Sequence, residues 1–181
     1  MAMSGGVRRY SGVAMIFHWL TALLVLGLIP VGFIMVNLGS GPLQNTLFDL
    51  HRSFGTVVLA VVALRLGYRI LHGAPPQEPS VAPWQRVVSE IVHWALYALL
   101  IVQPLVGWAG TSAFGARISV FGLFTLPDLV GKDEALSETL LGLHGLIGFA
   151  LAGLAAMHIA AALHHHFVLR DNVLKRMMPG R

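Results

Sequence analysis

Cysteine is absent from this chain of 181 residues, and charged residues make up only 11% of it. Without thiols the chain cannot form disulfides, zinc–thiolate sites, iron–sulfur clusters or thioether-linked cofactors. Soluble domains carry about 25% charged residues. The scarcity of charge, with 56% hydrophobic residues and a mean hydropathy of +0.74, therefore indicates an integral membrane protein. The net charge of +4 fits basic cytoplasmic loops, so the expected partner is the lipid bilayer and no nucleic-acid partner is expected.

Four apolar segments are long enough to cross a bilayer. The first follows Arg8 and Arg9, but it is longer than a signal-peptide core and lacks an A-x-A cleavage site, which indicates a retained helix. The sequence therefore predicts an all-α fold, an integral membrane four-helix bundle formed by one domain over 1–181. Its helices are expected at about 13–36, 46–71, 86–110 and 140–168.

The distribution of lysine and arginine predicts that both termini lie in the cytoplasm, because cytoplasmic loops are enriched in these residues. With that orientation only Arg52, Arg117 and Lys132 fall on the periplasmic side. The other basic residues fall on the cytoplasmic side: Arg8, Arg9, Arg65, Arg69, Arg86, Arg170, Lys175, Arg176 and Arg181. The segment 111–139 is too polar to span, and residues 120–124 (VFGLF) within it are expected to form a short segment on the membrane surface.

The last apolar segment carries His144 and His158 deep inside it. A polar ring within a membrane helix is costly, so it usually faces the bundle interior and has a partner there. Fourteen residues at about 100° each leave the two rings within about 40° of one face. The helical rise separates them by roughly 21 Å. One face of one helix therefore presents two imidazoles at different depths, as two stacked metal centres would require.

Depth in the membrane pairs His18 with His158 near the cytoplasm and His51 with His144 near the periplasm. Two neutral imidazoles that face each other across a bundle core suit haem iron, and helix bundles commonly hold cofactors in this way. A lone buried histidine often only bonds a neighbouring helix, but two depth-matched pairs favour metal ligation. His93 lies at the cytoplasmic depth and competes for a ligand role, with a structural or interface role as the alternative.

Small residues offer a second, weaker signal. They would let a flat macrocycle approach the helices, but close helix packing explains them at least as well. The glycines concerned are Gly27, Gly55, Gly142, Gly145, Gly148 and Gly153.

Three further residues are candidates for functional roles. His165 lies seven residues after His158, on the same helical face, and is a candidate for a substrate or proton path. The alternative is that the run 164–166 is only an interfacial polar end. Arg52 and Arg65 are candidates to bind a carboxylate or a small anion, because the guanidinium fork suits such groups. Arg65 has the alternative of a simple cytoplasmic anchor.

Several motifs together resemble the bacterial cytochrome b561 family. They are FHW in the first helix, LHR and LRLGYR in the second, the APP linker, the two histidines of the fourth helix and the ending HHHFVLRDNVLKRMMPGR. The resemblance covers essentially the whole chain. It implies a four-helix inner-membrane cytochrome with two b-type haems, whose iron ligands would be His18, His51, His144 and His158. It leaves His93 without a ligand role, and His164 has no counterpart in the family pattern.

The same resemblance implies an activity. Family members transfer electrons from a periplasmic donor to the quinone pool, and superoxide oxidation coupled to ubiquinone reduction is the reaction attached to the family. Superoxide, or another small periplasmic reductant, and ubiquinone are therefore the expected partners, with His165 or a neighbour as the proton source. One alternative is a cytochrome b membrane-anchor subunit that docks a periplasmic dehydrogenase through 111–139. Another is a transporter or structural bundle without haem.

Overall fold

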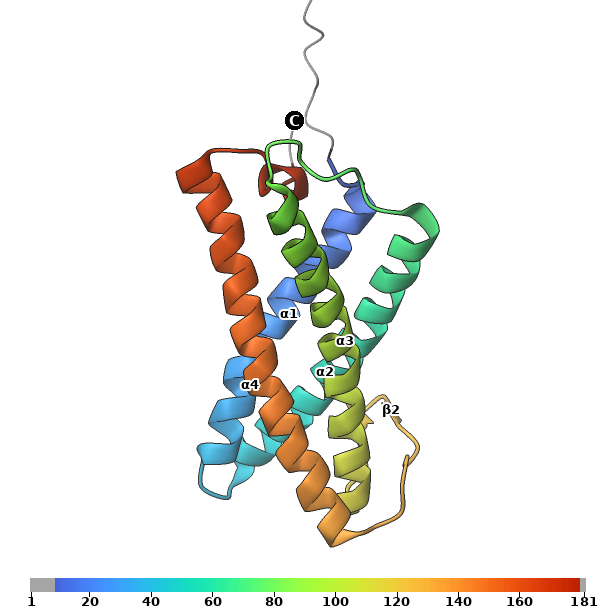
Figure 1. Ribbon diagram of the computed structural model, residues 1–181. Helices are drawn as coiled ribbons and strands as arrows, with labels where there is room; N and C mark the ends of the chain where they lie inside the picture. The colour runs from blue at the N-terminus through green and yellow to red at the C-terminus, as the bar shows by residue number, and fades with distance from the viewer. Residues whose placement is uncertain (1–8, 180–181) are drawn as a thin grey trace, which may run out of the picture.

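The computed structural model describes residues 9–179, and four long helices account for most of them (Figure 1). The helices are α1 (Gly12–Asn37), α2 (Pro42–His72), α3 (Pro83–Phe114) and α4 (Glu134–His164). The chain continues from α4 into a π-helical turn, η1 (His165–Leu169), and a short 3₁₀ turn, η2 (Lys175–Met177), follows. Each long helix is long and apolar enough to cross a membrane. The predicted all-α membrane bundle is confirmed.

Two helices begin well before the residues at which the sequence placed their starts. Helix α2 begins at Pro42 rather than near residue 46, because proline suits the first turn, where its missing N–H needs no partner. Helix α4 begins at Glu134 rather than near residue 140. The side chain of Asp133 caps it by accepting the Leu136 N–H at 3.0 Å. His51 and His144 therefore lie between about two and three turns inside their helices and not at the helix starts.

Helix α3 is longer at both ends than the expected 86–110. Pro83 occupies its first turn, and the helix runs on to Phe114. Gly115 ends it in a left-handed conformation, with φ of 85°, which glycine adopts without steric cost. Part of the segment 111–139 is therefore helical.

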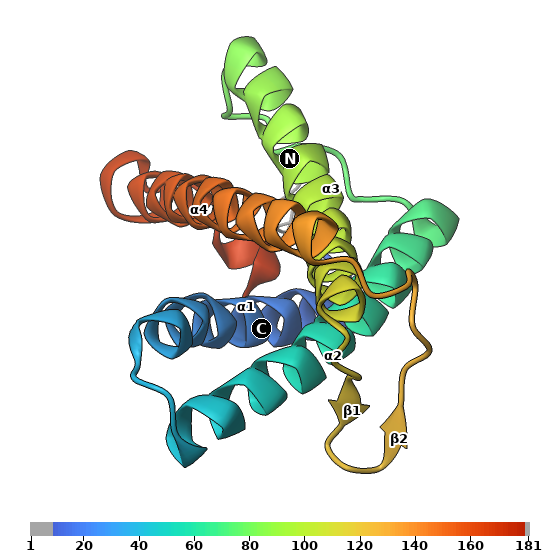
Figure 2. The same ribbon diagram turned by 90° about the horizontal axis from the view of Figure 1, so that it is seen from below.

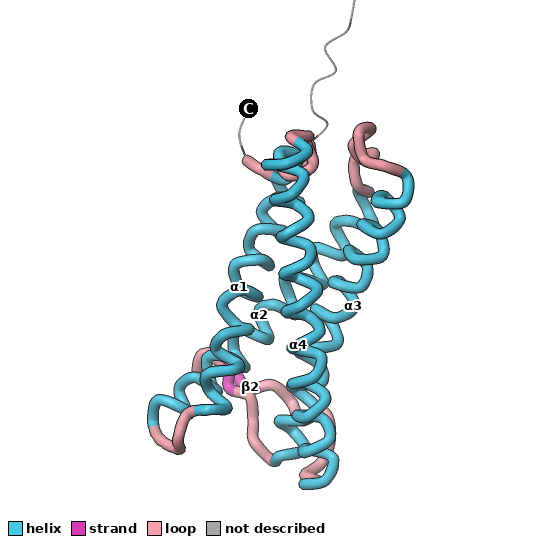
Figure 3. Tube along the Cα trace, turned by 60° about the vertical axis from the view of Figure 1, so that its left-hand side comes forward, coloured by secondary structure: helices cyan, strands magenta, loops and turns pink. Residues whose placement is uncertain are grey.

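The two ends of the bundle differ in what they carry (Figures 1 and 3). One end, called here the terminal end, holds both ends of the described chain and the α2–α3 connection. The opposite end, called the hairpin end, holds the α1–α2 turn and a two-stranded hairpin. Arg8 and Arg181 lie outside the described residues. Among the described basic residues, Arg52, Arg117 and Lys132 lie toward the hairpin end and the others toward the terminal end, as the sequence predicted. That the terminal end faces the cytoplasm stays a prediction.

The C-terminal segment closes over the terminal end. The Tyr10 N–H donates to the Arg176 carbonyl at 3.1 Å, and the Trp19 indole N–H donates to the Met177 carbonyl at 2.7 Å. Arg176 is itself buried and donates to the Pro76 carbonyl in the α2–α3 connection. These contacts join three segments that are far apart in the sequence.

The closest backbone packing joins α3 with α4, α1 with α2, and α2 with α3. A small apolar core lies where the helices meet, and its members are Val25, Val58, Val62, Tyr97, Leu100 and Leu151. Many other large apolar side chains are exposed on the outer helix faces. Such faces suit contact with a bilayer, because lipid tails are as apolar as these side chains.

The segment 120–124, expected to lie on the membrane surface, forms part of a β-hairpin beside α2 (Figure 2). Its position at the membrane surface stays a prediction. Strand β1 (Ser119–Val120) pairs with β2 (Phe124–Thr125). The buried Ser53 hydroxyl of α2 donates to the Ser119 carbonyl at 3.2 Å and accepts the Phe121 N–H at 3.0 Å. These hydrogen bonds fix the hairpin against α2 at Ser53, two residues after His51.

Candidate metal centres

Three histidines from three helices meet in the terminal half of the bundle. The ring centroids of His18 on α1 and His158 on α4 are 6.3 Å apart, with an interplanar angle of 74°. His93 on α3 lies closer to His158, at 5.3 Å and 72°. The structure therefore brings the predicted pair together and places the competing histidine beside it.

A second pair lies toward the hairpin end. The ring centroids of His51 on α2 and His144 on α4 are 6.1 Å apart, with an interplanar angle of 81°. Helix α4 thus contributes one imidazole to each pair. Within the described chain, the backbone of α4 packs closely against that of α3 but not against that of α1 or α2. Side chains therefore bridge these helices, and each histidine pair is one of the bridges.

The spacing of both pairs suits two imidazoles on opposite sides of one iron. A metal–nitrogen bond of about 2.0–2.1 Å, added to about 1.1 Å from that nitrogen to the ring centre, places two such centroids about 6.2–6.4 Å apart. The observed 6.3 and 6.1 Å agree with this value. The 5.3 Å between His93 and His158 is too short for two rings on opposite sides of one metal. The geometry favours His18 over His93 as the partner of His158.

Hydrogen bonds orient the His144 ring for metal binding. Its Nδ1 lies 2.9 Å from the Gln103 carbonyl oxygen, and a carbonyl only accepts, so Nδ1 carries the proton. Nε2 is then the nitrogen with a free lone pair, as in most histidines that bind a metal. The Gln103 side-chain amide in turn donates to the His144 carbonyl at 2.9 Å. Gln103 was not singled out from the sequence, although an uncharged polar residue inside an apolar segment was the available signal.

Two glycines lie directly against the rings of the hairpin-end pair. A Cβ on Gly107 of α3 would lie 2.8 Å from both Nδ1 and Cε1 of His144, and one on Gly32 of α1 would lie 3.2 Å from Cε1 of His51. These are not the glycines that the sequence suggested. Of those, Gly148 would meet the Gln103 amide nitrogen at 3.2 Å. A Cβ would meet no described atom within 4 Å at the others: Gly27, Gly55, Gly142, Gly145 and Gly153.

His51 and His18 differ in the state of their Nδ1 atoms. The buried Nδ1 of His51 has no hydrogen-bond partner among the described residues, and an unpaired buried nitrogen is costly unless a ligand satisfies the ring. His18 Nδ1 lies 3.0 Å from Nη2 of Arg65. A guanidinium only donates, so this nitrogen accepts and the proton of the neutral ring lies on Nε2. Metal binding at Nε2 of His18 therefore requires Arg65 to move to another acceptor, and a carboxylate is the group that arginine suits best.

Arg52 lies beside His51 at the hairpin end. Its guanidinium is 3.5 Å from the Asp49 carboxylate and 5.3 Å from the centre of the Phe48 ring. The Arg52 side chain keeps 25% of its surface exposed, whereas that of Asp49 keeps 74%. An exposed ion pair of this length is weak, so an anion can compete with Asp49 for Arg52.

His165 opens the π-helical turn after α4, and its Nδ1 lies 2.5 Å from Oδ2 of Asp171. His164 packs edge-on against it, with ring centroids 6.2 Å apart. The buried Nδ1 of His166 lacks a hydrogen-bond partner within the described chain. The sequence pointed to His165 but not to Asp171, because the contact depends on how the chain turns after α4.

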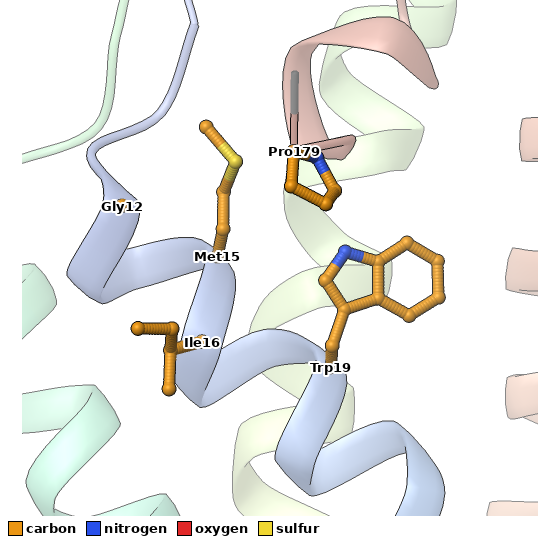
Figure 4. A pocket seen from close by; sticks show the side chains of 5 residues that line it. All are labelled: Gly12, Met15, Ile16, Trp19 and Pro179. Carbon is orange, nitrogen blue, oxygen red and sulfur yellow. The ribbon is translucent and has the colours of Figure 1, made fainter.

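An apolar pocket of about 670 Å³ opens at the terminal end beside the first histidine pair (Figure 4). Gly12, Met15, Ile16, Trp19 and Pro179 line it. The Trp19 ring lies 5.2 Å from that of His18. The lining suits a hydrocarbon group, because the Trp19 N–H already donates to the backbone.

A four-helix membrane bundle with a histidine pair toward each end is the arrangement typical of membrane electron-transfer cytochromes. Residues 9–180 match the model of the prokaryotic cytochrome b561 family. The chain belongs to this family. It is accordingly a multi-pass protein of the bacterial inner membrane that performs oxidoreductase-type electron transfer, and the family implies haem b as its cofactor.

Curated relatives match nearly the whole chain. It is 32% identical over 179 residues to cytochrome b561 homolog 2 of Escherichia coli (strain K12), covering 98% of this chain and 95% of the relative. It is 31% identical over 177 residues to the "Probable superoxide oxidase CybB" of Yersinia pestis, covering 96% and 98%. Cytochrome b562 of Cereibacter sphaeroides is 28% identical over 180 residues, covering 95% and 96%.

Proposed function

We propose that the protein is a superoxide oxidase that reduces ubiquinone. Two superoxide ions and one ubiquinone, with two protons, would yield two molecules of dioxygen and one ubiquinol. The observation that carries this proposal is the presence of two histidine pairs with iron-compatible spacing at two depths of one bundle. The similarity to a relative named as a probable superoxide oxidase supports the choice of donor.

In this proposal His51 and His144 hold one haem b, and His18 and His158 hold the other. Two bound haems would supply one-electron carriers between the two membrane faces. With two imidazoles of the chain to hold each haem, the bound groups would carry electrons and would not bind dioxygen. The arrangement of the chain thus favours outer-sphere electron transfer over oxygen activation at a metal.

The hairpin end is proposed as the periplasmic donor face. Arg52 neighbours His51 and is only weakly held by Asp49, so its guanidinium can attract a small anion such as superoxide. Arg52 thereby raises the encounter rate near the hairpin-end pair. The hairpin is bonded to Ser53 and so holds the first half of α2, which carries His51 and Arg52, in place.

The terminal end is proposed as the cytoplasmic face, where ubiquinone is reduced. This end carries most of the basic residues, in line with the positive-inside rule. His165 lies there and is the proposed proton source for the quinone. Arg65, once released from His18, is the proposed partner of a haem carboxylate.

The alternative function is a cytochrome b anchor subunit for a periplasmic dehydrogenase. One observation favours this alternative. Leu123 and Phe124 of the hairpin keep 81% and 54% of their surface exposed, which offers a docking partner an apolar contact. Co-purification separates the two functions, because an obligate subunit brings its partner whereas an autonomous enzyme does not.

The test is to purify the protein in detergent, measure its haem-to-protein ratio and dithionite-reduced spectrum, and then add superoxide with a soluble quinone. Two haems per chain with quinone-dependent consumption of superoxide is the expected result. Two haems without this activity would favour the anchor. One haem, or none, would overturn the pairing of the histidines.

A further inference from the structure

The chain turns back on itself directly after α4. The π-helical turn that starts at His165 ends at Leu169, and Arg170 adopts a left-handed conformation with φ of 54° and ψ of 33°. This reversal returns Asp171 to His165, where the Asp171 N–H donates to the His165 carbonyl at 3.2 Å. The Asp171 Oδ2 then lies 2.5 Å from His165 Nδ1. Only 13% of the His165 side chain and 10% of that of Asp171 remain exposed.

The carboxylate of Asp171 is itself held in place. Its second oxygen, Oδ1, accepts the Val173 N–H at 3.0 Å. Asp171 is therefore bonded through its backbone, through one carboxylate oxygen to the chain, and through the other to the imidazole. A group fixed in this way can hold the imidazole in one orientation.

The contact decides which nitrogen of His165 is available. An ionised carboxylate only accepts, so Nδ1 carries a proton and donates a hydrogen bond to Asp171. Nε2 is then the nitrogen that can take up and release a second proton.

We propose that Asp171 is a positioning residue that holds His165 with Nε2 as the nitrogen that gives protons to ubiquinone. The proposal rests on the proposed function. For each ubiquinone, two superoxide ions are oxidised to dioxygen, and the quinone gains two electrons and two protons. His165 transfers the Nε2 proton to a quinone oxygen and regains one from water. Asp171 keeps its Nδ1 hydrogen bond throughout and is not itself protonated.

A purely structural role for Asp171 is separable from this one. The turn is also closed by the backbone bond from the Asp171 N–H to the His165 carbonyl and by the Val173 N–H, which donates to Oδ1 of Asp171; neither bond involves the imidazole. Asp171→Asn removes the charge and keeps one side-chain carbonyl oxygen. Asp171→Glu restores a carboxylate. Asp133→Asn is the matched control, since Asp133 also accepts a backbone N–H but caps α4 at the hairpin end.

The experiment uses the full haem-loaded protein in detergent and three rapid-mixing reactions. They are reduction by superoxide, reoxidation by a soluble ubiquinone analogue, and reoxidation by ferricyanide, which takes an electron without a proton. For Asp171→Asn we expect quinone reoxidation to slow at least about tenfold in maximal rate with little change in KM. Haem content and the other two rates should stay within about twofold of the native values. Asp171→Glu should recover most of the lost rate, and Asp133→Asn should leave all three rates unchanged.

Each other result overturns the proposal. A native quinone rate in Asp171→Asn shows that Asp171 does not act on His165 in the reaction. A parallel fall in all three rates, or a loss of haem that Asp171→Glu does not restore, makes its role structural. The failure of the proposed function looks different, because the native protein itself would then be reoxidised by ferricyanide but not by the quinone.

Discussion

Replacing Gly107 with alanine tests whether α3 shapes the hairpin-end histidine pair. The new Cβ would lie 2.8 Å from Nδ1 and Cε1 of His144, whereas carbon atoms in contact prefer about 3.5–4.0 Å. The ring must therefore move by about 0.7 Å or more. That shift breaks the 2.9 Å bond to the Gln103 carbonyl and exceeds the roughly 0.2 Å tolerance of a metal–nitrogen distance.

The effect on stability should be much smaller than the effect on the site. Alanine favours a helix interior over glycine by about 1 kcal/mol. A lost hydrogen bond costs about 0.5–1.5 kcal/mol net. These two contributions nearly cancel, so we expect Gly107→Ala to fold with a near-native melting temperature while it loses one of two haems.

The assay compares the haem-to-protein ratio and the reduced spectrum with thermal unfolding followed by circular dichroism. Gly67→Ala in α2 is the matched control, because it gives the same helical gain and its Cβ would meet no described atom within 4 Å. Retention of two haems with a native spectrum in Gly107→Ala would refute the reasoning. So would the loss of a haem in Gly67→Ala.

Further predictions follow from the same contacts. His144→Ala and His158→Ala should each remove one haem and leave the other, measured as haem per chain; two retained haems in either variant would contradict the pairing. His93→Ala should keep both haems, because its 5.3 Å spacing to His158 does not suit a shared iron. Arg52→Gln should slow reduction by superoxide and flatten its dependence on salt, without changing reoxidation by ferricyanide. Ser53→Ala should lower stability by about 1–3 kcal/mol and increase amide exchange in the hairpin, since it removes both hydrogen bonds to 119–121.

The sequence placed the starts of α2 and α4 too late in the chain. The apolar segments located the membrane-spanning parts of α2 and α4, because lipid selects for apolar length. The helices themselves begin earlier, at Pro42 and Glu134. Helix starts depend on caps and first-turn residues, which lie outside the apolar segment. Proline at position 42 and aspartate at position 133 were the available signals.

The choice of close-approach glycines could not have been made from the sequence. Glycines on α4 were the natural candidates because they share a helix with His144 and His158. The structure places Gly107 of α3 and Gly32 of α1 against the rings instead. Which glycine meets a ring depends on how neighbouring helices are rotated about their axes, and no spacing within one helix specifies that rotation.

The sequence by itself determined the membrane bundle and the two depths at which α4 presents its histidines. Both follow from local rules, since a helix in lipid must bond its own backbone and its periodicity places residues fourteen apart on one face. Only the tertiary structure decided what surrounds those rings: the Gln103 carbonyl that orients His144, the Arg65 guanidinium beside His18, and the return of Asp171 to His165. These contacts join residues from different helices or across a chain reversal, and their distances are set by how the elements pack together.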